Sequence, residues 1–138
     1  MLSKELIREA DRIADECKVC SVASVSENGY PRICYLSPLK NNGVKEFWFS
    51  TGTNSTKVQH FNASPKASVS IQREGDSITL LGNMDIVKSK EDKDSLWQEW
   101  LARHFPNGGK DDPDYCIIHF IANEGTIYIA DQFETGQI

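Results

Sequence analysis

Apolar residues recur at helical spacing through the first sixteen positions of the chain, between Lys, Glu, Arg and Asp residues. The apolar positions are Leu2, Leu6, Ile7, Ala10, Ile13 and Ala14. This spacing places them on one face of an α-helix. Acidic residues share the polar face, whereas helices that lie on a membrane favour Lys and Arg there. The pattern therefore predicts an amphipathic helix that covers the edge of a protein core.

From Val19 onward the pattern changes to alternation of apolar and polar residues, which is typical of β-strands. Strands are predicted over residues 19–26, 31–39, 45–50, 67–72, 77–87, 115–122 and 126–130. Asn28-Gly29 and Asn42-Gly43 predict tight turns because these residues tolerate positive φ angles. Gly82, inside a long apolar run, predicts a bulge or a close backbone approach.

Two shorter helices complete the predicted elements. Ser55 is placed to cap a helix from about residue 56 to residue 62, and Ser89 with Asp92 forms a capping box for a helix that extends to about residue 104. The last residues, about 131–138, are predicted to form a short flexible tail. Most strands follow one another in hairpins, so the sequence predicts a mainly β fold, an antiparallel β-barrel with flanking helices, in a single domain over residues 1–138.

Composition and charge exclude several classes of function. Apolar residues make up 39% of the 138 positions, and no run approaches the roughly 18 apolar residues of a membrane span. The formal net charge of -5 argues against general affinity for nucleic acid or for an anionic membrane surface. The N-terminus lacks the apolar segment of a secretion signal, so a cytoplasmic location is expected.

The chain has four cysteines, of which Cys17 and Cys20 form a CKVC motif. Such a pair can share a zinc ion or form a disulfide. A structural zinc site needs a second ligand pair, and Cys34 and Cys116 stand apart from each other. Reduced, mostly buried thiols are the favoured interpretation, with metal binding as the alternative.

The junction of strand and helix between Phe47 and Phe61, FWFSTGTNSTKVQHF, concentrates hydroxyl groups before a single ammonium. If Ser55 caps the helix, the free N–H groups of its first turn, the hydroxyls of Thr51, Thr53 and Ser55, and Lys57 meet at one place. This arrangement suits a phosphate monoester. The alternative is an ordinary N-cap with a solvated lysine. Neither a G-x-x-x-x-G-K-[ST] run nor a G-x-G-x-x-G run occurs, so nucleoside triphosphate and Rossmann dinucleotide binding are not indicated.

Three motifs resemble the FMN-binding split barrels of the pyridoxamine 5'-phosphate oxidase-like family, of the general stress protein type. These motifs are the G-x-P-R hairpin, the strand with T-x-x-x-S-x-K followed by N-x-S-P-K-A-S-V-S, and W-x-x-W-L-x-x-x-F-P-x-G-x-x-D-D-P. The resemblance covers nearly the whole chain. It implies a six-stranded antiparallel split barrel that works as a homodimer and holds FMN in clefts at the subunit interface.

The resemblance also implies the cofactor contacts. Arg32 and Lys57 would neutralise the FMN phosphate with help from Ser55 and Thr56. The backbone of the next three residues after Arg32 would pass the flavin ring edge, and two residues at the strand end would contact the ring or the ribityl chain. Ser77 would stand in place of a family glutamine, and two tryptophans would lie near the cleft. These further positions are Ile33, Cys34, Tyr35, Ser50, Thr51, Trp97 and Trp100.

The chain also departs from the oxidases proper. Thr56 and Ser37 occupy positions that are basic in those enzymes, and the C-terminal segment that helps to bind the pyridoxal substrate is absent. An FMN-dependent oxidoreductase acting on a small molecule is therefore expected, without pyridoxamine phosphate oxidase activity. The alternatives are a noncatalytic flavin-binding or flavin-sensing module, a barrel that binds a deazaflavin or haem, and a fold with a degraded site that acts through dimer or partner contacts.

A few other residues are weaker candidates for a functional site. Trp97 and Trp100 stand at the i, i+3 spacing that is equally typical of a core-facing helix stripe. His60 and His119 have no acid or nucleophile partner visible in the sequence, and Asp112 lies in a turn that is expected to be solvated.

Overall fold

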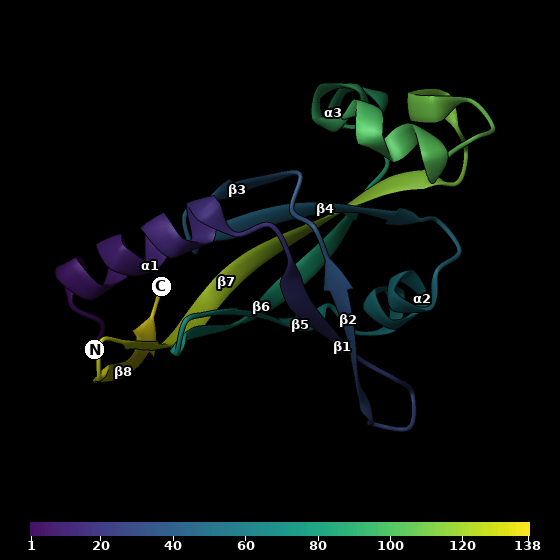
Figure 1. Ribbon diagram of the computed structural model, residues 1–138. Helices are drawn as coiled ribbons and strands as arrows, with labels where there is room; N and C mark the ends of the chain where they lie inside the picture. The colour runs from purple at the N-terminus through teal and green to yellow at the C-terminus, as the bar shows by residue number, and fades with distance from the viewer.

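A computed structural model describes all residues, 1–138, as an antiparallel sheet with helices at its edges (Figure 1). The helices are α1 (Lys4–Glu16), α2 (Thr56–Ala63) and α3 (Lys90–Leu96), with 3₁₀ helices η1 (Glu99–Arg103) and η2 (Gly109–Asp111). The strands are β1 (Cys20–Val25), β2 (Pro31–Leu36), β3 (Lys40–Asn42), β4 (Glu46–Gly52), β5 (Lys66–Arg73), β6 (Asp76–Val87), β7 (Tyr115–Ile129) and β8 (Gln132–Gln137).

The eight strands form one sheet in the order β2-β1-β5-β6-β7-β4-β3, with β8 added along β7. The first half of β7 pairs with β4 and its second half pairs with β8, while β6 pairs along the other edge of β7. The strands at the two ends, β2 and β3, do not pair with each other, so the barrel is split rather than closed. The predicted mainly β split barrel is confirmed, with eight strands in place of the six expected.

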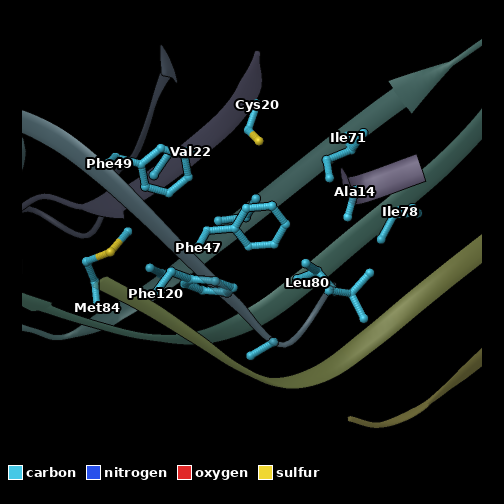
Figure 2. Packing of buried hydrophobic residues seen from close by; sticks show 14 of the residues in the cluster. Ala14, Cys20, Val22, Phe47, Phe49, Ile71, Ile78, Leu80, Met84 and Phe120 are labelled. Carbon is cyan, nitrogen blue, oxygen red and sulfur yellow. The ribbon is translucent and has the colours of Figure 1, made fainter. Parts of the chain in front are cut away.

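The core lies on one face of the sheet, because apolar side chains alternate with more exposed residues along the strands. A cluster of 24 buried residues includes the stacked rings of Phe47 and Phe49, together with Phe120 from β7 (Figure 2). The apolar face of α1 covers one side of this cluster through Leu6, Ala10 and its neighbours. The predicted amphipathic helix is confirmed.

A smaller cluster lies at the other end of the sheet, beneath α3 and the two 3₁₀ helices. It consists of Leu101, Phe105, Tyr115 and Ile117. The Phe105 and Tyr115 rings lie 5.0 Å apart, and Trp97 packs edge-on against Tyr115 at 5.2 Å. Figure 1 shows this helical region at the opposite end of the sheet from the chain termini.

The loop after η1 is held by a buried carboxylate. Asp112 accepts the backbone N–H of Asn107 and that of Asp114, both at 2.9 Å. The predicted solvated turn is therefore wrong at Asp112, since a buried carboxylate is retained where several N–H groups satisfy it.

The bulge predicted at Gly82 is confirmed. Leu81 of β6 lies opposite Glu124, but Gly82 lies opposite Ala122, so Asn123 is the extra residue on β7. A Cβ on Gly82 would clash with the carbonyl oxygen of Ile121, which explains why glycine stands there. The bulge also lets β7 continue as one strand, and the prediction of two strands separated at residues 123–125 is wrong for this reason.

Two other predictions need correction. The tail expected over residues 131–138 instead contains β8, because its backbone pairs with the second half of β7 and its Thr135 hydroxyl meets that of Thr126 at 3.0 Å. The helix expected to run to about residue 104 ends at Leu96 and resumes as η1, because Trp97 and Gln98 have extended backbone. None of the helices has the length and apolar character needed to span a bilayer.

Candidate functional site

The junction between β4 and α2 forms the N-terminal cap that the sequence predicted. Ser55 has extended backbone, and its Oγ accepts the N–H of Val58 at 3.3 Å. Helix α2 then runs over Thr56–Ala63, and Val58 and Phe61 anchor it to the core. The N–H groups at the start of α2 have no partner within the helix and carry the positive end of its dipole.

A chain of hydrogen bonds orients the ammonium beside this cap. Lys57 Nζ donates to Thr51 Oγ1 at 3.2 Å, and Thr51 Oγ1 donates to Ser55 Oγ at 3.1 Å. Thr51 is buried, and its hydroxyl accepts one hydrogen bond, from Lys57, and donates another, to Ser55. The Ser55 oxygen accepts two hydrogen bonds, which leaves its own hydrogen for a ligand.

These groups line a compartment of about 270 Å³ between β1, β2 and the start of α2. Its lining consists of Ser24, Arg32, Cys34, Ser55, Thr56 and Lys57. Two of the six side chains are cations and none is a carboxylate. Burial raises the pKa of the Cys34 thiol, while the charges of Lys57 and Arg32 act in the opposite direction. The compartment therefore presents hydroxyl donors and positive charge to a small anion.

A wider groove of about 460 Å³ shares Lys57 with the compartment. One wall comes from the strand ends of β2 and β4, and the opposite wall comes from η1 and the loop after it. The lining residues are Tyr35, Leu36, Ser37, Ser50, Thr51, Gly52, Lys57, Trp100, Arg103, His104, Phe105 and Asp114. This mixture of aromatic, apolar and polar groups is typical of a site for a planar ligand with hydrogen-bonding edges.

A third cavity of about 420 Å³ lies over β1, β5 and the bulge of β6 and β7. Its charged lining groups are one cation, Lys66, and one anion, Glu124. Because these charges offset each other, the cavity offers no surplus charge to a phosphate, and we place the candidate site in the compartment and groove instead.

Most of the predicted site residues line these two spaces, but three do not. Ile33 lies on the edge strand β2 with 64% of its surface exposed. Ser77 lies near the start of β6, opposite Gln72 and Tyr128. Trp97 packs against the small aromatic cluster, so its contact is with the core of the same chain.

Thr53 was grouped with the phosphate donors in the sequence, but the structure removes it from that set. Its N–H and its hydroxyl both lie near Asp114, and the hydroxyl donates to the carbonyl oxygens of Pro113 and Asp114 at 3.0 Å. Thr53 therefore fixes the strand end to the loop rather than facing the compartment.

The sequence did not indicate several residues that line the site, among them Ser24, Arg103 and His104. Ser24 lines the compartment, and its Oγ lies 2.8 Å from Nδ1 of His60. Arg103 and His104 line the groove, with Arg103 Nε donating to His104 Nε2 at 3.3 Å. Nothing in the sequence near Ser24 indicated that His60 would be its partner. His119 likewise has a partner, Glu46, at 2.8 Å, outside both spaces.

No group of three or more His, Cys, Asp or Glu side chains is arranged to hold a metal ion. The polar groups that converge in the compartment and groove are hydroxyls, cations, the Cys34 thiol, the His104 imidazole and one carboxylate, that of Asp114.

The chain is similar to one protein family and to several solved structures. The family model described as pyridoxamine 5'-phosphate oxidase matches residues 6–128. A Clostridium acetobutylicum protein, described as related to general stress protein 26 of B. subtilis and to the pyridoxinephosphate oxidase family, has 28% identity and a TM-score of 0.87. That match covers 99% of this chain and 97% of the other. None of the curated proteins matches the chain.

Two more distant structures share the fold. A pyridoxamine 5'-phosphate oxidase-related, FMN-binding protein from Nostoc punctiforme has 13% identity and a TM-score of 0.64, over 100% of this chain and 98% of the other. A haem-binding protein from Mycobacterium smegmatis has 13% identity and a TM-score of 0.78, over 99% of this chain and 60% of the other. At this identity the two similarities concern the fold alone.

Proposed function

The chain belongs to the pyridoxamine 5'-phosphate oxidase family, and on that premise we propose that it is an FMN-binding flavoprotein with oxidoreductase activity. The observation that carries this proposal is the convergence of Arg32, Lys57 and the Ser55 hydroxyl at the N-terminus of α2, around a compartment of about 270 Å³. A phosphate monoester needs positive charge and several donors in a small space, and this donor set supplies both.

The rest of FMN would extend from the compartment into the groove, because Lys57 lines both spaces. Ser50 and the strand end at Gly52 would face one side of the ligand, and Trp100 would face it from η1. FMN, when bound, supplies hydride or electron transfer. The residues of the chain would hold the phosphate, orient the ring and limit its contact with water.

Pyridoxamine 5'-phosphate itself is not the substrate that we propose. Thr56 and Ser37 line the compartment and the groove at positions where the resemblance to the oxidases implies basic residues. Each charge-assisted hydrogen bond that is lost forfeits about 1.5–3 kcal/mol. Another small redox substrate is therefore the better fit to the groove.

We further propose that the chain works as a homodimer. The hairpin of β1 and β2 exposes three large side chains, Tyr30, Ile33 and Tyr35, whose exposed fractions are 73%, 64% and 74%. Ile33 and Tyr35 lie on the edge strand β2, Tyr30 lies directly before it, and Tyr35 also lines the groove. A second subunit would cover this apolar surface and would bring further residues to the ligand.

A flavin-binding module without turnover is the second candidate. It is favoured by the environment of His104, the only histidine that lines the groove. Its hydrogen-bond partner is Arg103 rather than a carboxylate, so no acid–base pair stands beside the ligand.

Titration of the purified protein with FMN, followed by flavin fluorescence, tests the proposal. Riboflavin serves as the control without phosphate. We expect FMN to bind much more tightly than riboflavin, and equal binding of the two would contradict the phosphate site. Reduction of the bound flavin by NADH or NADPH, followed at the flavin absorbance band, then separates an oxidoreductase from a module that only binds flavin.

A further inference from the structure

The CKVC motif brings two thiols together at a place that the FMN site does not use. Cys17 is the C-cap of α1 and is half-buried, whereas Cys20 begins β1 and projects into the core (Figure 2). Their Sγ atoms lie 3.6 Å apart and form a hydrogen bond. Both cysteines are free thiols in this structure.

The two sulfurs have unequal environments. The hydrogen bond from Cys20 lowers the pKa of Cys17 to about 7, so a large share of Cys17 is thiolate at neutral pH. The same hydrogen bond, together with burial, raises the pKa of Cys20. An accessible thiolate beside a buried, protonated thiol is the arrangement of an attacking and a resolving cysteine.

The other two cysteines differ from this pair. Burial raises the pKa values of Cys34 and Cys116, and neither has a second sulfur as a hydrogen-bond partner. The two thiols of the motif supply half of the four ligands of a structural zinc site, and no third metal-binding side chain joins them. The geometry thus favours dithiol chemistry over metal binding.

We propose that Cys17 and Cys20 are a redox-active dithiol that a hydroperoxide oxidises to a disulfide within the chain. The Cys17 thiolate attacks the peroxide oxygen, the O–O bond breaks, and Cys17 becomes a sulfenic acid, while the departing alkoxide or hydroxide takes a proton from the solvent and leaves as an alcohol or water. The Cys20 sulfur then attacks the Cys17 sulfur, the S–O bond breaks, and the departing hydroxide takes the Cys20 proton as water. Two thiols lose two electrons in total, and the peroxide gains them.

A disulfide here would be reversible rather than a structural staple. The loop that it closes contains only the segment from Cys17 to Cys20, and so short a loop restricts the unfolded chain little. A bond that adds little stability and has one partly exposed sulfur, that of Cys17, is readily reduced by thiols. The pair is therefore suited to repeated oxidation and reduction.

Oxidation of the reduced full-length protein with hydrogen peroxide tests the proposal. The remaining thiols are alkylated under denaturing conditions, and the products are measured by intact mass and peptide mapping. We expect two of the four thiols to become protected, a peptide linked through Cys17 and Cys20, and full recovery with dithiothreitol. Cys17 should react roughly tenfold faster than an ordinary thiol, as its larger thiolate fraction implies.

Variants identify the role of each sulfur. Cys17→Ser should abolish the reaction, and Cys20→Ala should let a Cys17 sulfenic acid accumulate, which dimedone traps. Cys116→Ala is the matched control and should still form the disulfide. Four alkylatable thiols after peroxide treatment, a link between two chains, or a tightly bound zinc ion that protects both thiols would each overturn the proposal. None of these readouts depends on FMN, so they are independent of the proposed flavin function.

Discussion

The compartment and the groove share Lys57, but they are built in different ways. Half of the compartment lining comes from a cap and a helix that adjoin in sequence, and hydrogen bonds that Ser55 Oγ accepts from the Thr51 hydroxyl and the Val58 N–H fix its position. The far wall of the groove comes from η1, about forty residues later in the chain, and its position depends on side-chain packing. Local hydrogen bonds hold one space, whereas a remote aromatic cluster holds the other.

This difference predicts how each space responds to mutation. Loss of a cation in the compartment should reduce binding of the phosphate without altering the fold. Loss of a packed ring under the groove should alter the fold without directly removing a phosphate contact. Two measurements on each variant therefore distinguish the roles of the two spaces. One is the ratio of FMN affinity to riboflavin affinity, and the other is the free energy of unfolding.

Phe105→Ala should give the largest effect. Phe105 is buried among Tyr115, Trp97 and Leu101, and replacement of a buried phenylalanine by alanine costs about 3–5 kcal/mol. Urea unfolding monitored by circular dichroism should show this loss. Phe133→Ala is the control, since Phe133 is 66% exposed and should change stability by less than about 0.5 kcal/mol. A loss below about 1 kcal/mol in Phe105→Ala would show that the cluster does not support the groove wall.

Arg32→Ala and Lys57→Ala should each weaken FMN binding by about 1.5–3 kcal/mol, or roughly 10–150-fold, because each removes a charged donor from the compartment. Riboflavin binding and the proposed dimer should remain unchanged. Fluorescence titration measures the affinities, and gel filtration measures the oligomeric state. Lys66→Ala, in the third cavity, is the matched control. Unchanged FMN affinity in both compartment variants would show that the FMN phosphate does not bind in the compartment.

The compartment could largely be predicted from sequence because its signals are local. The serine cap, the hydroxyl-rich strand end and the lysine two residues after the cap adjoin in the chain, and the hairpin turn set the position of Arg32. The main strands and the Gly82 bulge were predictable for the same reason, since alternation and glycine act over a few residues. Thr53 was misplaced because its partner, Asp114, lies 61 residues away.

The groove could not be predicted in the same way. A continuous helix would have put Trp97 and Trp100 on one face, but the extended backbone at Trp97 and Gln98 separates them. Trp97 enters the small cluster, while Trp100 is 42% exposed beside the groove. The break depends on how this segment packs on β7, which no short pattern reports.

Ser55→Ala should have a smaller effect that connects stability with binding. It removes the cap of α2 and the acceptor of the Thr51 hydroxyl, and loss of an N-cap side chain costs about 0.5–2 kcal/mol. Thermal unfolding should show the loss, and FMN should bind more weakly while riboflavin does not. Ser64→Ala, at the C-cap of the same helix, is the control, because its backbone rather than its side chain makes the capping bond. Equal effects of the two variants would contradict the role of the Ser55 hydroxyl.

Arg103→Gln should give the smallest effect and should test whether the groove takes part in anion binding at all. Arg103 is exposed on the groove wall, and an exposed charge contributes about 0.2–1 kcal/mol, which falls further as salt screens it. If the phosphate lies in the compartment, FMN and riboflavin should lose the same few-fold affinity, because both place the same ring in the groove. Arg8→Gln, on the exposed face of α1, should change neither affinity. A different result would contradict this assignment. If FMN alone lost affinity, and by as much as in Lys57→Ala, the phosphate would bind in the groove rather than in the compartment.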